Sequence, residues 1–346
     1  MSIHVLIMAG GNGTRFWPVS TPEKPKQYTC LSSDDSLIQE SIKRSLKFSR
    51  AENIYVVTVE GQKQIASLQT KGMIPSENII IEPEGRNTAP CIFLGLLQML
   101  KNGVSKDDCI VVLPSDHVIN NQENFSRDIQ VASENAKKRQ TITVIGIPPT
   151  SPHTGYGYIQ KGESIDSELY KVSKFVEKPN SEIAEKYLAS GEYFWNAGMF
   201  ISTISTLLGE ISTHSQDLGA FKEELFNALG SPALVSKVYN KLPKDSFDYA
   251  VIEKSQRVDA LSSSFDWSDL GSWDALEDIT EASEDNFICS AENTQFLDSA
   301  GNIIYAPGKK VSLINCKDLV VVVNEGHVMV LPKSEAQKVK QLNQKI

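Results

Sequence analysis

Cysteine is scarce in this chain. Five cysteines occur among its 346 residues, and they are odd in number and widely spaced: Cys30, Cys91, Cys109, Cys289 and Cys316. This pattern argues against a disulfide framework and against a Cys-x-x-Cys metal knuckle. We expect these thiols to be reduced and mostly buried.

An excess of positive charge is also absent. The chain has 34 Lys and Arg residues against 43 Asp and Glu residues, a formal net charge of -9. Nothing in this balance favours general binding to nucleic acid or to an anionic lipid surface, so neither is expected as a partner. Any anionic ligand must therefore be held by a local basic site.

Long hydrophobic runs are missing as well. Residues 1–9 are apolar, but they lack a basic beginning and lead directly into a glycine pair, which predicts a buried strand rather than a signal peptide. The apolar stretch 91–100 is well short of the ~20 residues that a membrane span requires. The sequence thus predicts a cytoplasmic protein without a membrane partner.

The pattern that is present is typical of a large α/β protein. Hydrophobic residues make up 40% of the chain and charged residues 22%, which is ordinary for a globular protein. The length favours two domains or one large domain with an appendage. Short runs rich in Val and Ile are apolar throughout, as strands covered on both faces of a parallel sheet are; they are 3–8, 54–59, 79–81, 110–113 and 141–147. Amphipathic stretches predict the helices that connect them, at 37–48, 62–71, 88–101 and 125–138. The first half is therefore predicted to be a doubly wound α/β layer structure.

The second half elaborates this sheet and then changes character. A loop rich in Gly, Pro and Tyr follows Pro148, and we expect strands at 170–176 and 198–202 and helices at 181–190 and within 203–239. Acidic and small residues at 277–285 mark a boundary. Beyond it, short segments separated by turn residues predict a few coils of β-helix and a closing helix; they are 301–306, 311–313, 319–323, 327–331 and 333–344.

A glycine-rich run, Gly-Gly-Asn-Gly-Thr-Arg at 10–15, follows the first predicted strand. It lets the backbone turn sharply and direct several N–H groups at a phosphate, and Arg15 and Lys26 supply positive charge. The run matches neither a dinucleotide fingerprint, since Phe16 replaces the third glycine, nor a Walker loop. A plain turn from strand to helix remains the alternative.

Two acidic segments suggest a metal site. Asp116 follows the fourth predicted strand, at the sheet edge where ligands of open α/β sheets bind, and a carboxylate facing a phosphate calls for a cation such as Mg²⁺. The run 266–273 contains Asp266 and Asp269 between two tryptophans, and one of these carboxylates could complete the site. The alternatives are that Asp116 caps the helix near Asn124 and that Ser272 starts a helix on which tryptophan packs.

Polar residues near the later strands suit a sugar phosphate. Glu177 and Lys178, fixed by a following proline, can hold a sugar hydroxyl and a phosphate, although a solvated ion pair is the simpler interpretation. The aromatic stretch 193–200 is typical of core, yet Asn196 within it could offer an amide to a polyhydroxylated ligand. The five histidines lack metal-site spacing, and no Gly-x-Ser-x-Gly elbow is present.

Six segments taken together carry a resemblance to a known family. They are 10–17 with 25–27, 82–83 with 85–90, 114–117, 175–179, 195–200 and 266–273. In this order they resemble the sugar-1-phosphate nucleotidylyltransferases, and within them the mannose-1-phosphate guanylyltransferases, over residues 3 to about 280. Thr21 departs from an arginine common in the family. The chain also ends without the isomerase domain of longer members, so isomerisation of mannose 6-phosphate is not expected.

The resemblance implies a fold and a reaction. The fold is a Rossmann-like nucleotidyltransferase domain with a mainly parallel sheet at 1–280, followed by a small left-handed β-helix-like domain at 281–346. The reaction is transfer of GMP from GTP to mannose 1-phosphate with Mg²⁺, giving GDP-mannose and pyrophosphate. The sequence leaves the oligomeric state open, with a homodimer as one possibility. No general base is required, because a phosphate monoester with a second pKa near ~6 is already ionised at neutral pH.

The resemblance also assigns residues. The nucleotide is expected to bind at Gly10, Gly11, Gly13, Thr14, Arg15, Lys26, Glu82, Asn87, Thr88 and Asp116. Mg²⁺ is expected at Asp116 and Asp269, and these two residues with Arg15 and Lys26 form the catalytic set. The sugar phosphate is expected at Gly157, Glu177, Lys178 and Asn196.

Other functions and one site assignment stay open. A related transferase with another sugar or base, or a non-catalytic sugar-nucleotide sensor, would share the fold, while a dinucleotide-dependent oxidoreductase is disfavoured by the glycine pattern. Guanine offers N1–H and a 2-amino group as neighbouring donors, so Glu82 at the end of the third predicted strand could read it. The backbone of residues 85–90 is the alternative reader.

Overall fold

The computed structural model describes residues 2–11, 13–31 and 33–343. Asn12 of the glycine-rich run and Gln344 of the predicted closing helix lie outside these ranges. The described chain divides into two compact units that do not follow chain order. The first contains Met1–Gly10, Ile42–Pro114 and Asn121–Asp266, and the second contains Gly11–Ser41, Ser115–Asn120 and Trp267–Ile346.

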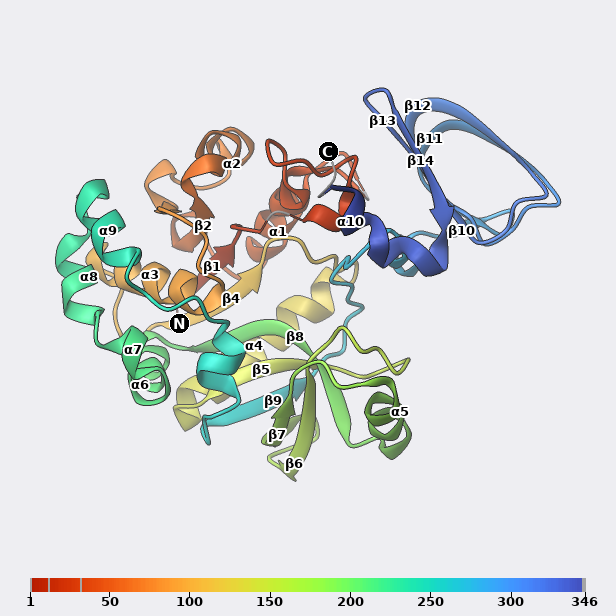
Figure 1. Ribbon diagram of the computed structural model, residues 1–346. Coiled ribbons are helices and arrows are strands. Elements are labelled where there is room, and N and C mark those ends of the chain that lie inside the picture. The colour runs from red at the N-terminus through yellow and green to blue at the C-terminus, as the bar shows by residue number, and fades with distance from the viewer. Residues whose placement is uncertain (1, 12, 32, 344–346) are drawn as a thin grey trace. The chain divides into compact units, whose positions relative to one another are not determined.

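The first unit is built on a nine-stranded mixed sheet with the order β3-β2-β1-β4-β8-β5-β9-β7-β6 (Figure 1). Neighbours among β3, β2, β1 and β4 are parallel, whereas β8 runs antiparallel to both β4 and β5. The strands are β1 Ile3–Met8, β2 Ile54–Val59, β3 Ile79–Glu82, β4 Cys109–Pro114, β5 Ile142–Ile147, β6 Tyr158–Ser164, β7 Leu169–Val176, β8 Tyr193–Thr203 and β9 Val258–Ser262. The parallel strands predicted at 3–8, 54–59, 79–81 and 110–113 are thereby confirmed, and antiparallel β8 makes the sheet mixed.

Helices cover both faces of this sheet. α3 and the helices α6 to α9 share one apolar core with strand residues such as Leu6 and Val112. α4 packs on β4, β5 and β8 from the other side. The helices are α1 Leu37–Ser45, α2 Lys63–Thr70, α3 Thr88–Lys101, α4 Gln122–Arg139, α5 Ser181–Ser190, α6 Ile204–His214, α7 Gln216–Gly219, α8 Lys222–Ala228 and α9 Pro232–Tyr239. Within the described ranges, no helix has both the length and the apolar character needed to cross a membrane.

Two strands of this nine-stranded sheet escaped prediction. β6 falls in the segment expected to be a loop, and β9 carries no signal beyond five residues, Val-Asp-Ala-Leu-Ser. Both form because neighbours complete their hydrogen bonds: β6 pairs with β7 and β8, and β9 lies between β5 and β7. β8 is also longer than expected, so the aromatic stretch 193–200 lies within a strand.

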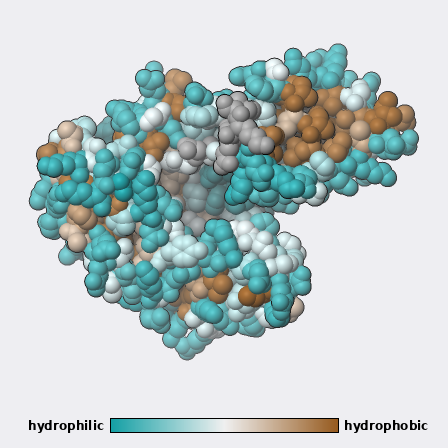
Figure 2. All heavy atoms as spheres, viewed as in Figure 1, coloured by the Kyte–Doolittle hydropathy of each residue, from teal (hydrophilic) through white to brown (hydrophobic). Residues whose placement is uncertain are grey.

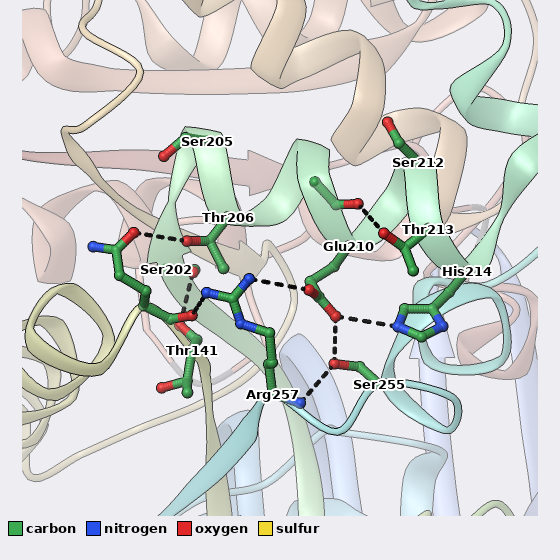
Figure 3. Close-up of polar contacts among 12 residues, drawn as sticks. Thr141, Ser202, Ser205, Thr206, Glu210, Ser212, Thr213, His214, Ser255 and Arg257 are labelled. Atoms are coloured by element: carbon green, nitrogen blue, oxygen red, sulfur yellow. Dashed lines mark hydrogen bonds and ion pairs between the residues drawn. The ribbon is translucent and has the colours of Figure 1, made fainter.

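A buried polar network ties α6 to the segment before β9 (Figure 3). Glu210, 5% exposed, accepts a hydrogen bond of 2.6 Å from the Ser255 hydroxyl and lies 3.2 Å from His214 and 3.5 Å from Arg257. The serine donates to the carboxylate and not to the histidine, which is not the order of an acyl-transfer triad. This network therefore stabilises the fold, consistent with the missing hydrolase motif.

The second unit holds a five-stranded sheet with the order β10-β11-β12-β13-β14. The elements are β10 Ala282–Ser283, β11 Asn286–Leu297, β12 Ile303–Ile314, β13 Leu319–Asn324, β14 His327–Pro332 and α10 Val339–Asn343. β11, β12 and β13 are parallel neighbours joined by short turns, as in the coils of a β-helix. The predicted closing helix begins as a 3₁₀ helix, Lys333–Lys338.

Two asparagines stack the coils of this unit. Asn302 Nδ2 donates a hydrogen bond of 2.8 Å to Asn286 Oδ1, and Asn302 Oδ1 accepts one of 3.0 Å from the Leu319 N–H. Three successive coils are thus linked by buried amides. Apolar side chains also gather on an exposed face over β11 to β14 (Figure 2), where the exposed fractions are 57% for Leu297 and 68% for Ile314.

The cysteines are free thiols, as expected, but they are not mostly buried. Cys91 and Cys109 lie in the core, Cys289 and Cys316 are partly exposed, and Cys30 is exposed. The exposed position of Cys30 follows from its place in a loop rather than in a strand or helix.

Candidate functional site

The glycine-rich loop requires glycine at position 13. Gly13 has φ +57°, and a Cβ there would lie 2.2 Å from the Lys26 Cβ. The loop therefore approaches the Lys26 backbone more closely than any side chain permits. A short 3₁₀ helix, Thr14–Phe16, follows, and Arg15 is exposed with its guanidinium donating 3.2 Å to the Gly271 carbonyl.

Lys26 brings the two predicted metal-binding residues together. Its side chain is 5% exposed. Nζ donates a hydrogen bond of 2.9 Å to Asp116 Oδ2 and another of 2.8 Å to the backbone carbonyl of Asp269. Nζ also lies 5.3 Å from the centre of the Phe16 ring. Lys26, Asp116 and Asp269 thus lie in one cluster in the second unit.

The Asp116 carboxylate is held in its ionised form. Burial by itself raises the pKa of Asp116, but the charges of Lys26 and His117 and the hydrogen bond from Lys26 lower it by more, so the pKa lies below its ordinary value. Asp116 is therefore a charged oxygen donor at neutral pH.

Asp116 is not the helix cap considered as its alternative. Asn121 caps α4, and its Oδ1 accepts the Asn124 N–H at 3.1 Å. The Asp116 side chain is thereby left to the contact with Lys26. The capping interpretation is wrong because the loop after β4 continues five residues further before the helix begins.

Of the two aspartates in the run 266–273, Asp269 joins the Lys26 cluster through its backbone carbonyl. Asp266 Oδ1 accepts the Asn121 N–H at 2.6 Å. The Asp269 carboxylate lies against Gly271, where a Cβ would come 3.2 Å from Oδ1. Leu270 between them has φ +45°, a strained value for a side chain of this size.

The tryptophans of this run build the loop. Trp267 donates from its indole N–H to His117 Nδ1 at 3.1 Å. Trp273, fully buried, packs on Phe16 with ring centres 5.0 Å apart and donates to the Trp17 carbonyl. A 3₁₀ helix, Trp273–Ile279, follows Ser272, and tryptophan packs at its start. The Ser272 side chain makes no capping hydrogen bond, so the alternative of a helix capped by Ser272 holds only in part.

The aspartate cluster fits a hard divalent cation in its donor chemistry. Mg²⁺ takes one or two protein carboxylates and fills its other positions with water and phosphate oxygens. Asp116 and Asp269 supply such oxygens, and the Lys26 ammonium already draws a carboxylate and a carbonyl oxygen toward one positive charge. Groups of three or more His, Cys, Asp or Glu arranged for a metal are absent from the described part of the chain.

A second cluster, in the first unit, contains the predicted sugar-phosphate residues. Lys178 Nζ lies 2.5 Å from Glu177 Oε1, and the Lys178 side chain is 61% exposed on a backbone with φ +47°. A Cβ on Gly157 would lie 2.6 Å from Glu177 Oε2 and 3.5 Å from the Asn196 Cβ. Gly157, Glu177 and Asn196 therefore lie together, and glycine at 157 makes room for the carboxylate.

Sequence reasoning missed one acid in this cluster. Asp248 Oδ1 accepts a hydrogen bond of 2.8 Å from Asn196 Nδ2. Burial and the neighbouring Glu177 carboxylate raise the pKa of Asp248 to about 6. The only sequence signal is Ser-Phe-Asp-Tyr at 246–249, which carries no recognisable metal or phosphate spacing.

The predicted base site contains a buried carboxylate. Glu82 is 3% exposed, and its Oε2 accepts the Tyr239 hydroxyl at 2.6 Å. Burial raises the pKa of Glu82, although hydrogen bonds from Tyr239, the Cys91 thiol and the Arg86 backbone N–H lower it in part. Glu82 thus holds the first turn of the loop that leads into α3.

The loop after Glu82 is strained at Asn87. This residue has φ +70° and ψ −175°, a region otherwise reserved for glycine, and its side chain accepts the Thr88 N–H at 2.9 Å. Thr88 Oγ1 accepts the Phe247 N–H at 2.8 Å. Among described residues before position 280, four non-glycine residues have positive φ, and three of them, Asn87, Lys178 and Leu270, lie in predicted site segments. Such strain clusters at functional sites.

Both interpretations of the base site lead to a measurable expectation. With the substrates that the resemblance implies, reading of the base by Glu82 predicts that Glu82→Gln lowers the preference for GTP over ATP or ITP by a few-fold and leaves the KM for mannose 1-phosphate nearly unchanged, because a site that hydrogen-bonds a base discriminates against bases that leave it unpaired. Reading by the loop backbone alone predicts an unchanged preference. The measurement is kcat/KM for each nucleotide.

The matched variant is Tyr239→Phe, which removes the hydroxyl on the buried side of Glu82. A change in nucleotide ranking in both variants indicates that Glu82 acts by holding the loop. A change in Glu82→Gln alone indicates direct contact with the base, and unaltered ranking in both removes Glu82 from base recognition.

Comparisons with known proteins decide the family. Residues 4–286 match the family model described as nucleotidyl transferase. The chain belongs to the nucleotidyl transferase family. Residues 292–346 match a second model, described as a MannoseP isomerase/GMP-like beta-helix domain. The enzyme class, the nucleotidyltransferase fold and the β-helix-like tail predicted from the sequence are thereby confirmed.

Relatives within the nucleotidyl transferase family are similar along nearly the whole chain. A Vibrio cholerae protein provisionally named mannose-1-phosphate guanylyltransferase is 38% identical over 97% of this chain and 73% of its own length. A Klebsiella pneumoniae mannose-1-phosphate guanylyltransferase is 36% identical over 97% of this chain and 72% of its own. A solved structure titled mannose-1-phosphate geranyltransferase, from Thermus thermophilus, has a TM-score of 0.90 at 30% identity and covers 100% of this chain and 99% of its own.

Proposed function

We propose that this nucleotidyltransferase transfers GMP from GTP to mannose 1-phosphate, giving GDP-mannose and pyrophosphate. The observation that carries the proposal is the convergence of Lys26, Asp116 and Asp269 in one cluster beside a loop that only glycine at 13 allows. Relatives at 36% to 38% identity that bear the name mannose-1-phosphate guanylyltransferase support the sugar and the base.

The chemistry needs positioning more than proton transfer. An oxygen of the sugar phosphate attacks the α-phosphorus of GTP, a new P–O bond forms, and the bond to the β-phosphate breaks with release of pyrophosphate. The attacking group is already anionic, so no side chain has to remove a proton. The protein must bring two anions into line and neutralise charge on the leaving group.

Residues of the second unit suit the triphosphate. We assign the backbone of Gly11, Gly13 and Thr14 with Arg15 to the β- and γ-phosphates, and Lys26 to the α-phosphoryl group. Lys26 has three N–H donors, and two of them bond to Asp116 and Asp269, which directs the third. Gly10, Glu82, Asn87 and Thr88 belong to the first unit, and we propose them as nucleotide-binding residues on the strength of the sequence alone.

Asp116 and Asp269 are the proposed ligands of Mg²⁺. When bound, the metal ion would supply positive charge to the phosphate oxygens. The Asp116 carboxylate, kept ionised by Lys26, accepts a hydrogen bond that orients the Lys26 ammonium.

Residues of the first unit suit the sugar phosphate. Lys178 is the proposed phosphate ligand, because its exposed ammonium is a mobile point charge. Glu177 and Asn196 would bind hydroxyls of the sugar, with Gly157 keeping the space beside Glu177 open.

Three further assignments remain proposals. The domain boundary is placed between residues 280 and 281, and a cytoplasmic location is expected from the sequence. A homodimer is proposed as well, and the exposed apolar face over β11 to β14 supports it, since such faces are typical of interaction surfaces.

The deciding experiment is a pyrophosphate-release assay with four nucleoside triphosphates against several sugar 1-phosphates. We expect GTP with mannose 1-phosphate to give the highest kcat/KM. A different preferred pair would keep the enzyme class and overturn the proposed substrates. Binding of sugar nucleotides with no release from any pair would favour the sensor, and a change in nicotinamide absorbance would favour an oxidoreductase.

Lys178→Ala tests the sugar-phosphate assignment. We expect the KM for mannose 1-phosphate to rise by about ten-fold or more, because a charge-assisted contact to phosphate is lost, while the KM for GTP changes little. The two Michaelis constants are the measurement. Lys174→Ala is the control, since it removes an exposed lysine from β7, the strand that leads to Lys178. An equal rise in both constants places Lys178 outside the sugar-phosphate site.

A further inference from the structure

Asp248 is an acid that the proposed reaction does not yet use. It begins a π-helical turn, Asp248–Ile252, and turns of this kind occur frequently at functional sites. Its carboxylate lies near Glu177 and contacts Asn196, two residues already proposed to meet the sugar. The question is what Asp248 contributes there.

The contact fixes which way the Asn196 amide points. Asn196 Nδ2 donates 2.8 Å to Asp248 Oδ1, and Asn196 Oδ1 accepts the Gly198 N–H at 3.1 Å. If the amide were flipped, its NH₂ would face the Gly198 N–H and its oxygen would face the Asp248 carboxylate. Both contacts would be repulsive, so one orientation is selected, and the second Nδ2 hydrogen is directed away from Asp248.

A carboxylate performs this task better than an amide can. An ionised carboxylate only accepts hydrogen bonds, whereas an asparagine in place of Asp248 could flip together with Asn196. The charge has a cost, because Asp248 is partly buried and faces the Glu177 carboxylate, with Lys178 as the nearby opposite charge. A residue serving only to fill space would not carry that cost.

Neighbouring bonds hold Asp248 in place. The Phe247 N–H bonds to Thr88 Oγ1 at 2.8 Å, and the Asp245 carbonyl accepts the Ala89 N–H at 3.1 Å. The segment that carries Asp248 is therefore fixed on the start of α3, and the carboxylate is presented from a rigid base.

We propose that Asp248 is a positioning residue of the sugar site, which holds the Asn196 amide in the one orientation that donates to a sugar hydroxyl. This inference rests on the proposed function and adds a specificity-determining residue to it. Asp248 acts through Asn196 and not on the reacting phosphates.

The kinetic test uses the full chain with Asp248→Ala, Asp248→Asn, Asn196→Ala and the double variant Asp248→Ala/Asn196→Ala. We expect Asp248→Ala to raise the KM for mannose 1-phosphate about ten-fold and to leave the KM for GTP within about two-fold, the loss of one well-placed hydrogen bond. Asp248→Asn should give a smaller rise, because the bond can still form. The double variant should be no worse than Asn196→Ala, because both changes remove the same contact. Glu253→Gln, an exposed acid just after the same turn, is the matched control.

Thermal unfolding separates positioning from folding. A carboxyl whose pKa is raised to about 6 binds its proton more tightly in the folded chain, so the stability it contributes at low pH is lost as the pH rises from its ordinary value of 3.8 through 6. Asp248→Asn should therefore raise Tm at pH 7.5 and leave it nearly unchanged at pH 4. A variant that is more stable and yet binds the sugar phosphate less well excludes misfolding as the cause.

The outcomes distinguish this inference from the function on which it rests. If the unaltered protein makes GDP-mannose but Asp248→Ala keeps its KM for mannose 1-phosphate, raises both constants equally or adds fully to Asn196→Ala, the positioning role is overturned and the function stands. If the unaltered protein shows no turnover, calorimetric titration with mannose 1-phosphate decides: weaker binding to Asp248→Ala supports the positioning role alone. No binding to the unaltered protein overturns both.

Discussion

Asp116→Asn and Asp269→Asn are each expected to lower kcat at least ~10²-fold, the typical cost of losing one strong electrostatic contributor. Each change removes a charged oxygen proposed to bind Mg²⁺. In Asp116→Asn the new amide oxygen can still accept the hydrogen bond from Lys26 Nζ, and Lys26 bonds to the backbone carbonyl of Asp269 and not to its side chain. Both variants should therefore stay folded, with circular dichroism and Tm close to those of the parent.

The chain offers a matched control for this pair. Asp266 lies three residues before Asp269 and bonds to the Asn121 N–H instead of the Lys26 cluster. Asp266→Asn should keep near-normal turnover, since an amide oxygen can accept the same bond. Near-normal turnover at saturating Mg²⁺ in Asp116→Asn or Asp269→Asn would show that the residue concerned is not a ligand.

Gly13→Ala is expected to have a comparable effect for a steric reason. The new methyl group would lie 2.2 Å from the Lys26 Cβ, at a φ of +57° that side chains rarely adopt. The loop or Lys26 must move, and misplacement of a catalytic group by about 1 Å can cost ~10²-fold in rate. We expect a loss of kcat of that order and a lowered Tm, measured on the same preparation.

Two other glycines calibrate this result. A Cβ on Gly11 meets no atom within 4 Å, so Gly11→Ala should cost less than Gly13→Ala, through altered phosphate binding alone. A Cβ on Gly61 likewise meets no atom within 4 Å, and Gly61 lies outside the proposed site, so Gly61→Ala serves as the neutral control. Equal activity in Gly13→Ala and Gly61→Ala would mean that the close approach of the loop to Lys26 is unimportant for catalysis.

The sheet order explains why the glycine-rich loop and Asp116 come from distant parts of the chain. β1 lies between β2 and β4, so the chain leaves β1 on one side, returns and continues on the other, and ligands of open α/β sheets bind at this switch point. The glycine-rich loop follows β1, and Asp116 follows β4. Asp269 joins them through a two-residue bridge in which Val118 and Ser268 exchange backbone hydrogen bonds at 2.9 and 3.1 Å.

Some proposed site residues could be predicted from the sequence because the motifs that mark them consist of neighbouring residues. Gly13 stands in a run of glycines, Glu177 and Lys178 are adjacent, and Asp116 closely follows a strand. Asp248 was not readable, because its role depends on Asn196, a partner 52 positions away. Likewise, only the structure distinguishes the two aspartates of the run 266–273. Asp269 lies beside Lys26, whereas Asp266 accepts a hydrogen bond from the backbone N–H of Asn121, the N-cap residue of α4.

The sequence by itself determined the α/β class, the four parallel strands β1 to β4, the β-helix-like tail and the identity of most proposed site residues. These features depend on runs of apolar residues and on short motifs, whose physical effect is exerted within a few neighbouring positions. Tertiary structure decided the rest: the insertion of antiparallel β8 between β4 and β5, the strands β6 and β9, the burial of Glu82 against Tyr239 and the pairing of Asp248 with Asn196. Each of these requires a hydrogen-bond partner supplied from far along the chain, and no local pattern encodes where that partner lies once the chain is folded.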